Sequence, residues 1–174
     1  MAIHHHVEQN SPEWQALRAG LPTASEFKRI LTNTGKVSSS ARDYACELAA
    51  EKLAGHAVNA WGGNLWTERG HGLESEARDW YAFETGLDVQ PGDFWTDDEG
   101  RWGCSPDGLV GDDGGIEIKS LKAANVISAW LDWQDSQKPP TDYLAQIQGN
   151  LFVTGRKWWD LVIYHPALPA ANSI

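Results

Sequence analysis

"RWGCSPDGLVGDDGGIEIKS", residues 101–120, predicts two short strands joined by a glycine-rich turn. In its last six residues, GIEIKS, the two-residue period of a strand directs the two isoleucines to one face and Glu117 and Lys119 to the other. The first face is apolar and belongs to a core. The second face carries an acid and a base, so the segment combines a fold signal with candidate chemistry.

Asp107 adds a second acid to this segment. It follows a Ser-Pro turn ten residues before Glu117, and the intervening GDDGG allows the two strands to lie side by side. The two carboxylates would then be close, at a cost on the order of a few kcal/mol in repulsion unless a cation such as Mg2+ lies between them. On the same face, Lys119 could steer a water or neutralise charge on a phosphate. The alternative for a bare E-x-K on a strand is a surface hairpin with a Glu-Lys ion pair.

Helix and strand signals surround this segment. Ser11-Pro12 predicts the start of a helix that ends at Gly20, and Thr23-Ala-Ser-Glu26 has the form of a capping box that starts a second helix. Further helices are expected after the serines 38–40, before Gly86 and over 141–154, and a last strand over 157–165. Helices on both sides of a small sheet place the chain in the α/β or α+β class.

Apolar periodicity also predicts which side chains are buried. In the helix after the serines, Tyr44, Leu48 and Leu53 are expected to face the core, and Gly55 ends the helix. The two cysteines, Cys46 and Cys104, are too few for a disulfide framework or a four-cysteine zinc site, so both are expected to be small buried side chains.

The composition is that of a globular chain. With 174 residues, 41% hydrophobic and 22% charged, it is expected to form a single domain over 1–174 with a flexible N-terminus over 1–10. His4, His5 and His6 fall in that terminus, where disorder is favoured over a metal site. Neither a membrane-spanning run of about 20 apolar residues nor a signal-peptide layout is present, so a cytoplasmic location is expected.

The net charge of -10 argues against nucleic acid as a general partner, but the acidity is unevenly distributed. Residues 61–117 hold fourteen acidic and three basic side chains. Such a concentration can form a divalent-metal site, whereas Asp97, Asp98 and Glu99 are more typical of a solvated turn. The uneven distribution therefore weakens the objection to a nucleic-acid partner.

Asp107 in SPDG, followed after nine residues by EIK, resembles the D-x(n)-E-x-K signature of the PD-(D/E)XK nucleases. Over roughly residues 10–166, five segments occur in the order seen in the lambda-type alkaline exonucleases of phage recombination systems: EWQALRAGLPTASEF, RGHGLESEARDWYAFETG, CSPDGL, GIEIKS and YLAQIQGNLFVTG. The resemblance implies an α/β (α+β) fold with a restriction-endonuclease-like PD-(D/E)XK core, a small mixed β-sheet flanked by helices.

The resemblance also implies a metal centre. Its ligands would be Asp107, Glu117, Glu74 and the backbone carbonyl of Ile118. Lys119 would orient and activate the attacking water. Glu76 is a rival to Glu74, but the two point about 200 degrees apart on a helix, and the family pattern selects Glu74. Mg2+ is the expected cofactor, and Mn2+ suits the same oxygen ligands.

A pocket for the 5'-phosphate of the digested strand is implied as well. The matching residues are Arg18, Ser25, Ser105 and Gln146. The planar guanidinium of arginine suits phosphate, whereas Ser25 by itself could equally be a first-turn helix residue without a function. A second arginine expected after the TASE helix has no clear counterpart, and Lys36 is the candidate in its place. Trp66, before the acidic helix, is a candidate wedge against a base at the duplex fork.

The activity implied by the resemblance is metal-dependent 5'-to-3' exonuclease action on double-stranded DNA ends, which releases 5'-mononucleotides and leaves 3' single-stranded overhangs for recombination. The family further implies a homotrimeric ring, a single-strand annealing partner, and a phage or prophage protein in a bacterial host. Two alternatives remain open: a structure-specific or restriction-type endonuclease, and a non-catalytic DNA-binding descendant of the fold. The four acidic and basic groups of the metal centre argue against the second, because buried polar groups cost stability.

Overall fold

The computed structural model describes residues 2–58 and 65–168, and the side chains of all of these except 65–71. The chain forms two compact units. The first unit comprises residues 1–61, 92–106 and 141–156, and the second comprises 62–91, 107–140 and 157–174. The single domain over 1–174 stays a prediction.

The second unit contains a four-stranded mixed sheet in the order β2-β5-β6-β7. Its strands are β2 (Val89–Gln90), β5 (Gly108–Val110), β6 (Gly114–Ser120) and β7 (Trp158–Tyr164). The β5-β6 pair is the predicted antiparallel hairpin, whereas β6 and β7 run parallel from Gly114 opposite Trp158 to Ser120 opposite Tyr164. The small mixed sheet is thus confirmed.

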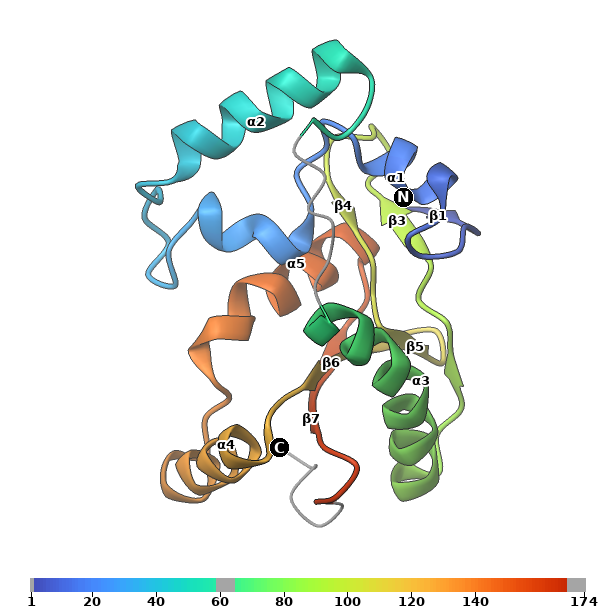
Figure 1. The fold of residues 1–174 in the computed structure, drawn as a ribbon, viewed down its shortest axis with the longest axis vertical. Coiled ribbons are helices and arrows are strands. Elements are labelled where there is room, and N and C mark those ends of the chain that lie inside the picture. The colour runs from blue at the N-terminus through green and yellow to red at the C-terminus, as the bar shows by residue number, and fades with distance from the viewer. Residues whose placement is uncertain (1, 59–64, 169–174) are drawn as a thin grey trace. The chain divides into compact units, whose positions relative to one another are not determined.

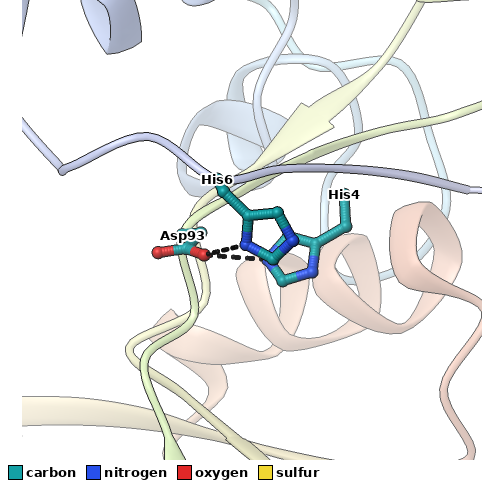
Figure 2. Close-up of side chains that lie close together, drawn as sticks. All are labelled: His4, His6 and Asp93. Atoms are coloured by element: carbon teal, nitrogen blue, oxygen red, sulfur yellow. Dashed lines mark hydrogen bonds and ion pairs between the residues drawn. The ribbon is translucent and has the colours of Figure 1, made fainter.

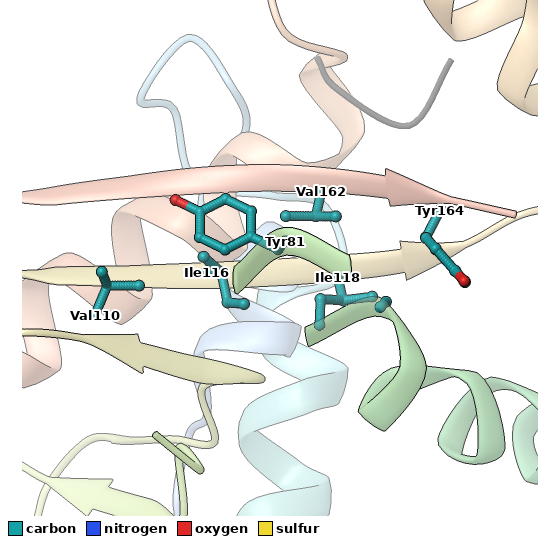
Figure 3. Close-up of a cluster of buried hydrophobic side chains, with 7 residues drawn as sticks. Tyr81, Val110, Ile116, Ile118, Val162 and Tyr164 are labelled. Carbon is teal, nitrogen blue, oxygen red and sulfur yellow. The ribbon is translucent and has the colours of Figure 1, made fainter. Parts of the chain in front are cut away.

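Helix α3 (Leu65–Thr85) packs against this sheet, and α4 (Ala123–Ser136) follows β6 in the chain. The core between α3 and the sheet consists of Ala77, Tyr81, Val110, Ile116, Ile118, Val162 and Tyr164 (Figure 3). Because side chains alternate along a strand, the residues of β6 between and beyond these isoleucines face away from this core. The apolar face of the GIEIKS segment is therefore where the sequence predicts it.

Two glycines at the start of β6 make room for the tryptophans of β7. A Cβ atom at Gly114 would lie 2.0 Å from the Trp158 ring, and one at Gly115 would lie 2.5 Å from the Trp159 ring. Trp158 and Trp159 are consecutive in a strand, so they cover opposite faces of the sheet. Any larger residue at either glycine would displace an indole.

The first unit contains helices α1 (Pro12–Arg18), α2 (Ala41–Ala54) and α5 (Leu144–Thr154), the 3-10 helices η1 (Ala24–Arg29) and η2 (Thr141–Tyr143), and a three-stranded sheet in the order β1-β3-β4. Its strands are β1 (Ile3–His5), β3 (Phe94–Thr96) and β4 (Gly103–Cys104). Helix α5 packs closely on η1 (Figure 1), because Gly149 lacks a Cβ that would lie 2.7 Å from Phe27 and 2.8 Å from Ala24.

Several local expectations are wrong. Residues 3–5 form β1, paired with β3, where a flexible N-terminus was expected. A helix does begin after Thr23, but it is a 3-10 helix and the Thr23 side chain makes no capping hydrogen bond. Leu53 is 91% exposed and Cys46 is exposed, because α2 buries only Tyr44; Cys104 is buried as expected. Helix α4 was not anticipated.

No helix of the described residues is long and apolar enough to cross a membrane.

Candidate active site

Asp107 and Glu117 lie close together in the second unit. Asp107 comes immediately before β5, and its Oδ2 accepts a hydrogen bond of 2.6 Å from the backbone N–H of Ile118 in β6. Glu117 is only 1% exposed, and Lys119 donates a 2.6 Å hydrogen bond from Nζ to its Oε1. The hairpin therefore brings the two carboxylates and the lysine into one group, as the sequence predicts.

Glu74 joins this group from α3. Arg78, one helical turn later, donates a 2.6 Å hydrogen bond to Glu74 Oε1 and a 2.9 Å hydrogen bond to the backbone carbonyl of Asp107. Glu76 instead accepts a 2.6 Å hydrogen bond from the hydroxyl of Tyr164. Of the two helix glutamates, Glu74 is thus the one tied to Asp107.

The electrostatics of this group are those of crowded carboxylates. Burial is the main cause of a strongly raised pKa at Asp107, and the charges of Glu117 and Glu74 raise that pKa further, while Lys119 opposes them. A proton relieves such repulsion, and so does a divalent cation. Carboxylate oxygens are hard ligands, so Mg2+ or Mn2+ fits this donor set. The N–H of Ile118 is held by Asp107, and the role of its carbonyl as a ligand stays a prediction.

The first unit connects three of the residues predicted to bind the 5'-phosphate. The indole N–H of Trp14 donates a 2.9 Å hydrogen bond to Ser105 Oγ, and the guanidinium of Arg18 lies 4.2 Å from the centre of the same ring. Arg18 also donates a long 3.4 Å hydrogen bond to Thr23 Oγ1, which lies 3.4 Å from Ser25 Oγ. We call these five residues the Arg18 cluster.

Arg18 is partly buried and has acidic groups nearby. Burial lowers its pKa, and Tyr44, Glu26 and Glu51 act in the opposite direction. A guanidinium does not lose its proton in proteins, so the cluster contains a fixed positive charge and the three hydroxyl groups of Thr23, Ser25 and Ser105. This combination is suited to an anion with several oxygens.

The other predicted phosphate and DNA residues are Gln146, Lys36 and Trp66. Gln146 is partly buried on α5, the helix that packs on η1, which carries Ser25. Lys36 is exposed in a turn where its N–H is held by Thr32 Oγ1 at 3.2 Å. Trp66 lies outside the residues whose side chains the structure describes.

Sequence reasoning missed two supporting residues, Arg78 and Trp14. Both had a spacing signal, because Arg78 follows Glu74 by four residues and Arg18 follows Trp14 by four, and such pairs meet on one helix face. Their hydrogen-bond partners lie far away in the sequence, so no spacing indicated them. Arg78 bonds the carbonyl of Asp107, and Trp14 bonds the hydroxyl of Ser105.

Residues 13–157 match the YqaJ-like viral recombinase domain family. The crystal structure of an alkaline exonuclease, LHK-Exo from Laribacter hongkongensis, is similar with a TM-score of 0.76 and 34% sequence identity over 94% of this chain and 78% of that chain. LHK-Exo in complex with dAMP gives the same values. A phage related exonuclease from Haemophilus somnus 129PT shares the fold, with a TM-score of 0.62 and 20% identity over 86% of this chain and 71% of that chain.

No curated protein matches the sequence. The similarity to these exonuclease structures confirms the mixed α/β fold and the predicted resemblance to the lambda-type alkaline exonucleases. Since the family match extends over most of its length, this chain belongs to the YqaJ-like viral recombinase family.

Proposed function

We propose that this chain is a metal-dependent 5'-to-3' exonuclease that acts on the ends of double-stranded DNA, releases 5'-mononucleotides and leaves 3' single-stranded overhangs for phage-type recombination. The observation that carries the proposal is the connected group of Glu74, Asp107, Glu117 and Lys119 in one unit. Family membership and the similarity to LHK-Exo, an alkaline exonuclease, support it.

The metal would be held by the three carboxylates, with the backbone carbonyl of Ile118 as a further ligand. When bound, a divalent ion supplies positive charge that stabilises the phosphate and makes a nearby water a stronger acid. Arg78 is a positioning residue in this scheme, because it holds both the side chain of Glu74 and the backbone of Asp107. Mg2+ is the proposed cofactor, with Mn2+ as a substitute.

Lys119 is proposed as the catalytic lysine that orients and activates the attacking water. Its ammonium lies 2.6 Å from Glu117 Oε1, which fixes its position next to the proposed metal ligands. From there it can orient the attacking water and offset negative charge that develops on the phosphate. The burial of Glu117, which is 1% exposed, argues against a simple surface hairpin for this pair, because burying a charge costs stability.

The Arg18 cluster is proposed to bind the terminal 5'-phosphate. Its fixed positive charge and the hydroxyls of Ser25 and Ser105 match the donors that a phosphate monoester needs. Gln146 is proposed as a further phosphate contact, and Lys36 and Trp66 as DNA contacts. The homotrimeric ring, the single-strand annealing partner and the phage or prophage origin are proposed from the family resemblance.

The experiment that tests the function compares linear and closed circular duplexes, each incubated with Mg2+ or with EDTA. We expect mononucleotides from the linear duplex with Mg2+ only, and an intact circle. A 5' end label should appear in the earliest products, ahead of a 3' end label. Cleavage of the circle would favour the endonuclease, and binding without cleavage of either substrate would favour the non-catalytic descendant.

A further inference from the structure

Two histidines and one aspartate meet in the first unit, and none of the three is assigned to the nuclease reaction. His4 Nε2 and His6 Nδ1 each lie 3.0 Å from the same oxygen, Oδ2 of Asp93. One ligand atom from each of the three side chains lies within 4.8 Å of the other two. Figure 2 shows both imidazoles directed toward this carboxylate.

The fold fixes this arrangement. Strand β1 pairs with β3 so that His4 lies opposite Trp95, and the two rings stack at 4.3 Å with an interplanar angle of 12 degrees. His4 and His6 are two residues apart in extended chain, so both point to the same side. Asp93 has a φ of 54 degrees, a left-handed conformation that aspartate tolerates better than most residues, and it directs its carboxylate at the histidines.

We propose that His4, His6 and Asp93 form a binding site for a borderline divalent transition-metal ion such as Zn2+, with solvent completing the coordination. Imidazole together with carboxylate suits Zn2+, whereas Mg2+ prefers oxygen ligands alone. Tetrahedral Zn2+ at about 2.0–2.1 Å separates neighbouring ligand atoms by roughly 3.3 Å, so the present 3.0 Å contacts need to open by only about 0.3 Å.

This site differs from the carboxylate centre in its ligands, which include two imidazoles, and in its expected effect, which is structural. It joins β1 to the residue that precedes β3, so the ion would clamp the N-terminal strand onto the first unit. Expectations from the sequence favoured disorder here, because three consecutive histidines have no local signal that pairs them with a residue 87 positions away. Nothing in the proposed nuclease reaction requires this ion.

The test uses Co2+ as a spectroscopic probe and Zn2+ as its competitor, on the metal-free chain of residues 1–174 with excess Mg2+ present to occupy the carboxylate centre. We expect one equivalent of Co2+ to give a visible ligand-field absorption that Zn2+ abolishes. The variants His6→Ala and Asp93→Asn should weaken binding at least about 10- to 100-fold, the range produced even by loss of a group that only supports a ligand.

His5→Ala is the matched control. His5 lies between the two ligands and its Nε2 is 3.0 Å from Thr96 Oγ1, so its loss should leave the Co2+ spectrum unchanged. His6 is 79% exposed, so its replacement should not prevent folding, and a Zn2+-dependent rise in melting temperature should be lost with it. Undiminished binding by His6→Ala, or an equal loss in His5→Ala that marks nonspecific binding by a histidine run, would overturn the proposal.

Discussion

Replacement of Arg18 by alanine should slow digestion of 5'-phosphorylated DNA far more than digestion of DNA with a 5'-hydroxyl. Among the described residues of the first unit, its guanidinium makes one hydrogen bond, the long 3.4 Å contact with Thr23, so most of its donors can serve a ligand. A hydrogen bond to a charged group is worth about 1.5–3 kcal/mol, which corresponds to roughly a 10- to 100-fold loss of rate on the phosphorylated end.

The substitution also removes the contact of Arg18 with the Trp14 ring, worth about 0.5–1 kcal/mol to folding. That structural loss is the same for both substrates, so the ratio of the two slowing factors isolates the phosphate contact. The assay measures initial rates of nucleotide release from matched duplexes with and without the 5'-phosphate. On the hydroxyl end, the wild type should already be slow.

Arg29→Ala is the matched control. Arg29 lies in the same unit and over an aromatic ring, that of Tyr44, but its guanidinium is engaged by both oxygens of Glu47 at 2.7 Å. Its replacement should therefore affect the two substrates equally. Equal slowing of both substrates by Arg18→Ala would refute the phosphate pocket and leave Arg18 as a general backbone contact or a structural residue.

Three further predictions concern the carboxylate centre. Lys119→Ala should lower the cleavage rate by roughly 10²-fold or more while the Mg2+ affinity measured by calorimetry is unchanged; a parallel fall in both would make Lys119 structural. Arg78→Met should lower that affinity by roughly 10- to 100-fold, because Glu74 loses its anchor, and an unchanged affinity would remove Arg78 as a positioning residue. The raised pKa of Asp107 means that metal-free folded protein holds a proton that the unfolded chain releases near pH 3.8, so the free energy of unfolding should decline as pH rises above that value. Asp107→Asn should lack this decline in urea unfolding, and an identical pH dependence in both proteins would contradict the raised pKa.

The central hairpin could be predicted because its signals are local. Alternation in β6 separates Glu117 and Lys119 from the isoleucines, and the glycine-rich turn places Asp107 beside them. Helical geometry likewise separates Glu74 from Glu76, and the structure shows them with different partners. Where the two-residue period of a strand or the roughly 3.6-residue period of a helix determines which way a side chain points, the sequence was sufficient.

Helix α4 was missed because its ends lack the usual markers. Its apolar Val126, Trp130 and Trp133 follow a helical period, but the residue before the helix, Lys122, makes no side-chain cap. The helix ends at Gln137 in a left-handed conformation, with a φ of 52 degrees, where glycine is the usual signal. A helical period without residues that mark the helix ends was a weak signal, and the strand that precedes α4 gave a stronger one.

Contacts between distant parts of the chain could not be derived from spacing. The hydrogen bond from Trp14 to Ser105 spans 91 residues, and that from His4 to Asp93 spans 89. Strand β1 is too short to show a strand period in its sequence. Its pairing with β3 therefore depends on tertiary structure. Residues such as these define the Arg18 cluster and the proposed Zn2+ site.

The central claim is that the carboxylates beside β5 and β6 cleave DNA, and Asp107→Ala tests it most directly. With Mg2+ present, this variant should release no nucleotides from linear duplex DNA, while it binds the DNA as tightly as the wild type or more tightly, since a negative charge near the phosphates is removed. Asp112→Ala, an exposed acid in the turn of the same hairpin, should cleave at the wild-type rate. Normal nucleotide release by Asp107→Ala would contradict the account.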